Sequence, residues 1–170
     1  MRDARLIVRP ATCDDAEVVT EVLAASYTRL WQGHYAASDL DLLLPLVSRA
    51  QPQLLASGRY LVAVSDGQTA GCGGWSLAVP GTSGKIIPGC GHIRHFAVHP
   101  DHLRKGVGRA LYDACLSQAR EEGLARLEAW SSLQAVPFYQ RLGFDIVERF
   151  TVDFPGGVGL ASVRMIADPI

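Results

Sequence analysis

Cysteine is scarce in this sequence, and neither sign of charge is in excess. The four cysteines, at positions 13, 72, 90 and 115, form no C-x-x-C pair, which favours reduced thiols in a cytoplasmic protein over a disulfide framework. The 16 Lys and Arg residues nearly balance the 17 Asp and Glu residues, which gives a formal net charge of −1. This balance argues against nucleic-acid binding, because such binding needs a concentrated positive surface.

Long apolar runs, repeats and low-complexity segments are missing as well. No run approaches the roughly 20 apolar residues of a membrane-spanning helix. The charged N-terminus leads into the short apolar run 6–8, so neither a membrane protein nor a signal peptide is expected. With 48% hydrophobic and 19% charged residues the composition is globular. We therefore expect one domain over residues 1–170, with its core at about residues 5–167.

Apolar periodicity predicts a mixed order of strands and helices. Strands are expected at residues 5–9, 60–64, 70–79, 91–98, 125–131, 144–152 and 160–166. Helices are expected at 12–27, from 38 onward with a kink or break at Pro45, near 51–57, at 106–122 and at 135–142, with Gly123 and Gly143 ending the last two. Residues 65–67 predict a hairpin turn, and the loop at 80–85 is a candidate flap beside a substrate.

The most informative segment is FAVHPDHLRKGVGRAL, residues 96–111. An apolar strand ends at its histidine and proline, and Gly106 and Gly108 then open a helix. The first N–H groups of a helix lack intrahelical partners and attract anions, and glycine lets a phosphate approach the backbone closely. With three basic residues at the same point, the segment predicts a pyrophosphate site. A tight turn without a ligand is the alternative, since the spacing matches neither the dinucleotide-binding motif nor the P-loop.

A second segment, AVPFYQRLGF at residues 135–144, follows in the expected place for a helix that ends in Gly-Phe. Together, in this order, the two segments resemble the acetyl-CoA motif and the following helix of the GNAT N-acetyltransferase superfamily. The element order is also similar over about residues 5–167. The resemblance implies an α/β (α+β) fold, with a GNAT-like central mixed, mostly antiparallel sheet of about seven strands flanked by helices. CoA would lie where two parallel strands splay apart.

The resemblance implies transfer of an acetyl group from acetyl-CoA to a primary amine of a small molecule or peptide, by direct attack in a ternary complex. It implies that strand backbone pairs with the pantetheine arm and that amides of the glycine turn hold the pyrophosphate. The expected cofactor-binding residues are Phe96, Ala97, Val98, Arg104, Lys105, Gly106, Val107, Gly108, Arg109, Ala110, Gln134 and Tyr139. Gln134 departs from the Asn of many relatives, and Leu103 from their Arg or Gln.

By the same resemblance, Tyr139 is the expected proton donor to the departing thiolate, and a strand N–H near Val98 polarises the thioester carbonyl. Relatives place an acid at the position of His92, which makes His92 the expected general base. His95, Glu128 and a water molecule remain alternatives. Strand alternation is expected to put His92 and His95 on opposite faces of the sheet.

The resemblance places the acceptor site at residues 27–56 and at the loops 79–89 and 153–159. The first of these segments holds Trp31, His34 and Tyr35 near an acidic pair, Asp39 and Asp41, which could favour a small amine. A packed connection between two helices is the alternative interpretation.

Three further alternatives stay open. Histidines at 92, 95, 99 and 102 have the spacing of a zinc-binding helix face, but Pro100 would break that helix, so no metal is expected. A non-catalytic CoA-binding or sensor module is the second alternative, and transfer of a longer acyl group is the third. The resemblance also leaves a homodimer open beside a monomer.

Overall fold

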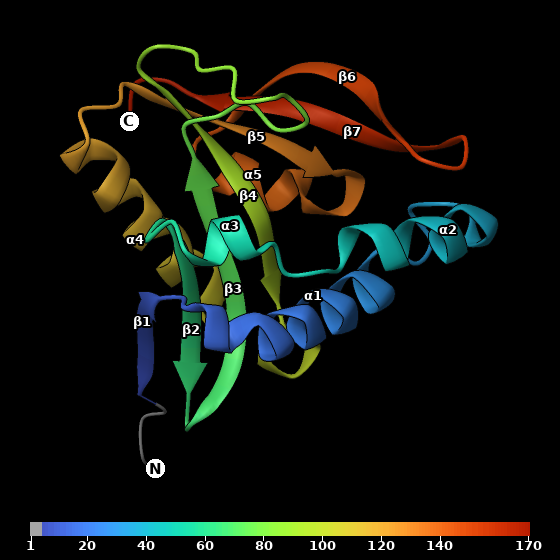
Figure 1. The fold of residues 1–170 in the computed structure, drawn as a ribbon, viewed down its shortest axis with the longest axis horizontal. Coiled ribbons are helices and arrows are strands. Elements are labelled where there is room, and N and C mark those ends of the chain that lie inside the picture. The colour runs from blue at the N-terminus through green and yellow to red at the C-terminus, as the bar shows by residue number, and fades with distance from the viewer. Residues whose placement is uncertain (1–4) are drawn as a thin grey trace.

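The structure, a computed structural model, describes residues 5–170 as a seven-stranded sheet with helices on both faces (Figure 1). The strands are β1 (Leu6–Pro10), β2 (Tyr60–Ser65), β3 (Gln68–Ser76), β4 (Cys90–Val98), β5 (Arg126–Ser132), β6 (Asp145–Phe154) and β7 (Val158–Ala167). They lie side by side in the order β1-β2-β3-β4-β5-β7-β6. Among the neighbouring strands of residues 5–170, only β4 and β5 run parallel, which confirms the expected mixed, mostly antiparallel sheet.

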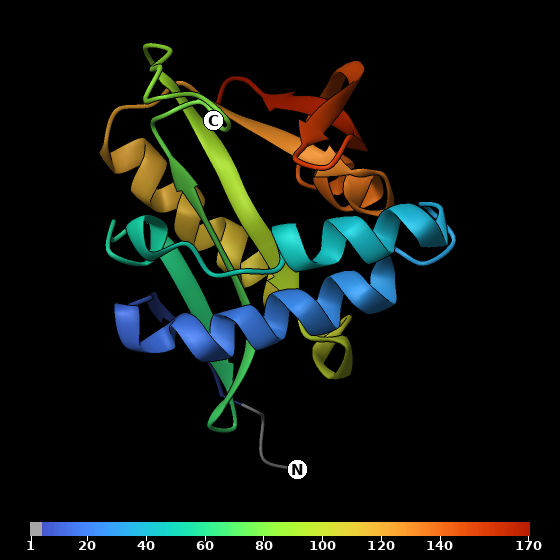
Figure 2. The same cartoon turned by 45° about the vertical axis from the view of Figure 1, so that its right-hand side comes forward.

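The helices divide between the two faces of the sheet (Figure 2). They are α1 (Ala16–Leu30), α2 (Ala37–Val47), α3 (Pro52–Leu55), α4 (Val107–Glu121) and α5 (Val136–Arg141). Leu23 of α1 and Leu43 of α2 are fully buried against one face, and Leu111 of α4 is fully buried against the other. Among residues 5–170, no helix has both the length and the apolar character needed to cross a membrane.

Local sequence signals place several boundaries correctly. Asp66 and Gly67 form the two-residue turn between β2 and β3 with φ values of 50° and 79°, as a type I′ hairpin turn requires. Gly123, with φ 76°, follows α4 as expected. Pro45 does not break α2, which continues to Val47. Pro45 lies in the last turn on the exposed side of the helix, where water can satisfy the carbonyl that loses its partner.

Two boundaries differ from the sequence prediction by three residues. The first helix continues three residues beyond the expected end at Tyr27, to Leu30. β3 ends at Ser76 instead of continuing to residue 79, so the loop before β4 spans residues 77–89. A bridge between Ala78 and Ile86 closes this loop on itself.

Candidate active site

The site forms where β4 and β5 separate. The two strands pair in parallel only from Cys90 to His92, opposite Arg126 to Glu128. Beyond His92, β4 continues along β3 as far as Val98. The expected splay between two parallel strands is therefore confirmed, and it leaves the β5-facing backbone of residues 93–98 outside the ladder.

A β-bulge redirects β4 inside this splay. The register against β3 shifts here, and His95 takes a φ of 46°, in the left-handed region. Gly73 lies opposite the bulge, at a point where a Cβ would overlap the Phe96 ring. The hydroxyls of Tyr60 and Tyr27 donate to the carbonyls of His95 and Phe96 over 2.8 and 3.5 Å respectively. Hydrogen bonds from these two tyrosines thus hold the strand in its bent course.

A cavity of about 500 Å³ lies between the end of β4, the glycine turn and α5, and we call it the turn cavity. Most residues expected to bind the cofactor line it, namely Phe96, Ala97, Val98, Arg104, Gly106, Val107, Gly108, Arg109, Gln134 and Tyr139. Lys105 and Ala110 do not line it, and the Lys105 ammonium instead donates to the Asp101 carbonyl over 2.9 Å. Ser26 and His102 also line it, without any signal in the sequence.

The glycine turn opens α4 beside this cavity. Gly106 directly precedes the helix and has a φ of 78°. The first hydrogen bond of α4 runs to the Gly106 carbonyl, so the N–H groups of residues 107–109 have no partner inside the helix. A Cβ at Gly108 would come within 3.0 Å of the Phe138 ring. The turn can therefore hold an anion on its backbone N–H groups. A side chain larger than that of glycine at position 108 would fill this space.

A second cavity, of about 360 Å³, lies between α1 and the β6–β7 hairpin. We call it the aromatic cavity after four of its lining residues, Tyr27, Trp31, Trp130 and Phe154. Pro80 and Gly81 line it as well, which agrees with the expected position of a flap. The two cavities share the residues Phe96, Gln134, Ala135 and Tyr139. A group held in one cavity can therefore meet a group held in the other at these residues.

Tyr139 stands at this junction. Its side chain is 6% exposed and comes from α5, with Phe144 packed against its ring at 5.3 Å between centroids. Burial raises the pKa of Tyr139 far above its usual range, so the phenol stays protonated at neutral pH. A protonated hydroxyl between two cavities has the form that a proton donor needs.

His92 and Glu128 do not line either cavity. They face one another across β4 and β5, with 3.9 Å between His92 Nδ1 and a Glu128 carboxylate oxygen. Within the described chain neither ring nitrogen of His92 has a hydrogen-bond partner. Burial lowers the pKa of His92, with nearby Glu128 opposing the shift. Glu128 also accepts from Trp130 Nε1 over 2.8 Å and pairs with Arg164 at 3.3 Å.

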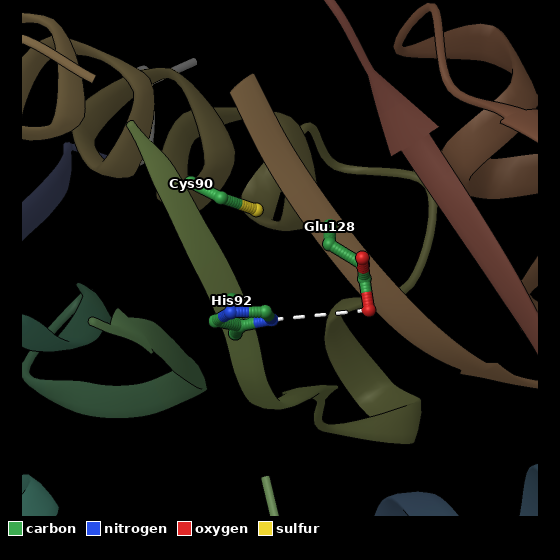
Figure 3. A group of neighbouring side chains, drawn as sticks. All are labelled: Cys90, His92 and Glu128. Atoms are coloured by element: carbon green, nitrogen blue, oxygen red, sulfur yellow. Dashed lines mark ion pairs between the residues drawn. The ribbon is translucent and has the colours of Figure 1, made fainter. Parts of the chain in front are cut away.

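Cys90 extends this buried pair into a group of three. Its sulfur, a His92 nitrogen and a Glu128 oxygen all lie within 4.8 Å of one another (Figure 3). The four histidines considered as a zinc-binding helix face do not form one, because His92 and His95 lie on β4 and Pro100 begins a short 3₁₀ turn.

The bulge changes where His95 points. The Gln51 amide nitrogen lies 3.0 Å from His95 Nε2, and the Gln51 amide oxygen accepts from Arg94 over 3.4 Å. Arg94 and His95 therefore both contact Gln51 and lie on the same face of the sheet. Arg94 also lies on the same face as His92, because the two are two positions apart on the strand. The expectation that His92 and His95 occupy opposite faces is wrong, since the bulge inserts a residue into the alternation. Burial lowers the pKa of His95 to about 4.

The model of the Acetyltransferase (GNAT) family matches residues 19–144. This chain belongs to the GNAT family. The match includes most of α1 and the glycine turn, and it confirms the family to which the two sequence segments pointed.

Solved structures agree on the GNAT fold. A GCN5-related N-acetyltransferase from Rhodopseudomonas palustris has a TM-score of 0.79 at 24% identity, covering 99% of this chain and 98% of its own. The PaiA N-acetyltransferase of Thermoplasma acidophilum, in complex with coenzyme A, has a TM-score of 0.72 at 16% identity, with coverage of 96% and 99%. The yncA protein of Salmonella typhimurium, with acetyl-CoA, has a TM-score of 0.64 at 20% identity, with coverage of 96% and 93%.

The residues that the sequence suggested for an acceptor site lie only partly in the aromatic cavity. Trp31 lines the aromatic cavity, but the half-buried Asp39 and the exposed Asp41 lie outside it. The Tyr35 hydroxyl donates to the Ala161 carbonyl over 2.8 Å and accepts from a backbone N–H, so this ring belongs to a packed connection. Arg94, which also lines the aromatic cavity, was not among the residues expected from the sequence.

Proposed function

We propose that this chain transfers an acetyl group from acetyl-CoA to a primary amine of a small molecule or peptide within a ternary complex. The observation that carries the proposal is the pair of cavities that meet at Phe96, Gln134, Ala135 and Tyr139. A module that only senses CoA needs the turn cavity alone. Two adjoining cavities, with a protonated phenol between them, suit a reaction between two bound molecules.

The turn cavity fits the cofactor part of the proposal. The N–H groups of residues 107–109 would hold the pyrophosphate, with Arg104 and Arg109 beside them. The unladdered backbone of β4 would pair with the pantetheine arm. Two of the similar structures, from Thermoplasma acidophilum and Salmonella typhimurium, hold coenzyme A and acetyl-CoA respectively, which supports this choice of co-substrate.

In the proposed reaction, a carbon–nitrogen bond forms at the thioester carbonyl and the carbon–sulfur bond breaks. The His99 N–H donates to Ala70 of β3 over 2.8 Å. Because successive N–H groups of an extended strand point to opposite sides, the Val98 N–H faces the splay, where it would stabilise charge on the carbonyl oxygen. Tyr139 would protonate the departing thiolate.

The amine must also lose a proton, and we assign that proton to solvent in the aromatic cavity. His92 and Glu128 do not line this cavity. His95 does, but its Nε2 already faces the Gln51 amide at 3.0 Å. His92 as general base is the untested alternative to solvent, and because His92 is buried, any proton transfer to it from the acceptor would be indirect.

Thermal unfolding with and without excess acetyl-CoA tests the cofactor part, since a ligand at 100 times its Kd adds about 2.7 kcal/mol to stability. We expect a clear rise in melting temperature, followed by thiol release when a suitable amine is supplied. If acetyl-CoA, CoA and longer acyl-CoA thioesters all leave the melting temperature unchanged, the turn is structural and the proposal fails. A larger rise and faster thiol release with a longer thioester would replace acetyl by that acyl group.

A further inference from the structure

Arg94 is a half-buried arginine in the wall of the aromatic cavity. Its guanidinium donates to the Ser76 hydroxyl oxygen over 3.0 Å and to the Gln51 amide oxygen over 3.4 Å. Both acceptors are neutral. Within residues 5–170, no carboxylate oxygen lies within 4.0 Å of Arg94. The charge of Arg94 is therefore taken partly out of water without an opposite charge beside it.

Four other arginines of the chain are placed differently. Arg9, Arg59, Arg109 and Arg164 each pair with a carboxylate at 2.8 to 3.3 Å. A charged group that is moved out of water needs such compensation, because the loss of hydration is costly. Burial also lowers the pKa of Arg94, which reflects the same cost. An anion bound in the aromatic cavity would provide the opposite charge that Arg94 lacks within the described chain.

The neighbours of Arg94 hold its guanidinium in place for such a ligand. The Ser76 hydroxyl donates to the Ala78 carbonyl over 2.8 Å, so its oxygen is turned to accept from Arg94. Gln51 is held at its other end by His95. A guanidinium has five N–H donors, of which these two contacts use only two. The remaining donors suit a planar carboxylate, which arginine binds with two parallel hydrogen bonds.

We infer that the acceptor is a small amine that also carries a carboxylate, and that Arg94 binds this carboxylate in the aromatic cavity. The inference rests on the proposed acetyl transfer. Arg94 lies two residues before Phe96, one of the residues where the cavities meet, so a compact molecule can reach from the guanidinium to the thioester. The volume of about 360 Å³ is small for a ligand site and fits an amino acid. The aromatic rings would pack against its apolar part.

The test compares matched acceptors. Thiol release is measured with acetyl-CoA and each of the standard amino acids, their amides and the corresponding decarboxylated amines. For at least one amino acid we expect kcat/KM about 100-fold above that of its amide and its decarboxylated amine. Phosphoethanolamine, which carries a phosphate instead, should react no better than the decarboxylated amines. If phosphoethanolamine is preferred, the carboxylate assignment is overturned in favour of a phosphate.

Variants of Arg94 connect the preference to this side chain. In Arg94→Gln the preference for the carboxylate should fall at least tenfold, mainly through KM, and Arg94→Lys should restore part of it. Arg120→Gln, on the exposed side of α4 and outside both cavities, is the matched control and should keep the full preference. If Arg94→Gln lowers the melting temperature but leaves the preference intact, Arg94 has only a structural role.

Binding gives a readout that does not depend on turnover. Amino acids should raise the melting temperature of the CoA complex, and their decarboxylated amines should not. The rise produced by CoA itself should be the same in Arg94→Gln as in the parent protein. Loss of the CoA effect in the parent protein overturns the proposed function. A normal CoA effect, with no amino acid either bound or acetylated, overturns the present inference alone.

Discussion

The turn cavity takes much of its wall from one stretch of chain, residues 96–109, whereas the aromatic cavity gathers its wall from segments between Tyr27 and Ser162. The first offers backbone N–H groups at the start of a helix. The second offers side chains, among them Arg94 and four aromatic rings. Backbone groups can serve the same ligand with many different sequences, but side chains fix which acceptor fits. Members of a family can therefore share the turn cavity and differ in the side chains of the aromatic cavity.

The largest expected effect comes from substitutions that block the turn cavity and leave the aromatic cavity unchanged. Gly106→Glu should weaken CoA binding about 100-fold or more, because it places a carboxylate beside the proposed pyrophosphate site and like charges in contact cost several kcal/mol. Gly108→Glu should do the same, with an added clash against Phe138. Titration of CoA by calorimetry measures the loss.

Gly123→Glu is the control for Gly106→Glu. Gly123 has a φ of 76°, against 78° for Gly106, and a Cβ at either position would meet no atom within 4 Å. The backbone strain of the two substitutions is therefore matched, and only the position relative to the turn cavity differs. Normal CoA affinity in Gly106→Glu would show that the phosphate site lies elsewhere.

The next effect tests the junction of the two cavities. Tyr139→Phe should lower kcat about 100-fold, the usual order for loss of a general acid, and leave CoA affinity nearly unchanged. Thiol release and the melting shift with CoA measure the two quantities. Tyr112→Phe, a buried tyrosine outside both cavities, should keep normal turnover. If Tyr139→Phe instead unfolds or loses CoA, the tyrosine supports the fold and donates no proton.

A pH experiment sharpens the description of the aromatic cavity. Because the folded protein lowers the pKa of His95 from 6.5 to about 4, the unfolded chain binds a proton at His95 between these values and the folded chain does not. Above pH 6.5 His95 is neutral in both states, so it does not change the free energy of unfolding. As the pH drops from 6.5 toward 4, protonation of the unfolded chain lowers that free energy. Relative to His95→Gln, the parent protein should lose about 1.4 kcal/mol for each pH unit in this window.

Urea unfolding at several pH values measures this difference, and taking it between parent and variant removes the contribution of other titrating groups. His34→Gln serves as the control for loss of an exposed imidazole. Parallel curves for the parent and His95→Gln would mean that His95 is open to water and does not form a fixed wall of the cavity.

The smallest expected effect concerns a residue outside both cavities. His92→Gln should change kcat/KM less than about threefold if solvent takes the proton from the amine, whereas loss of a general base costs 10²–10⁴-fold. The pH–rate profile is the deciding measurement. A hundredfold loss, together with disappearance of the acidic limb of the profile, would restore His92 as the base and require a water path from the aromatic cavity.

The sequence predicted the elements of the fold well, because their signals are local. Apolar alternation, the turn at Asp66 and Gly67, and the glycines that end α4 and α5 each depend on a few adjacent residues. The ends of β3 and α1 were misjudged, since both depend on contacts across the molecule. The effect of Pro45 was misjudged too, because a proline near the exposed end of a helix costs little.

What the sequence determined by itself is the strand, turn and helix of residues 96–121 and the helix that carries Tyr139, because helix starts and glycine conformations follow from neighbouring residues. Only the tertiary structure decided the aromatic cavity. The bulge at His95 depends on Gly73 of another strand, and the contacts of Arg94 depend on Gln51, 43 residues earlier in the chain. Such contacts leave no periodic trace in a sequence, because the fold alone brings their partners together.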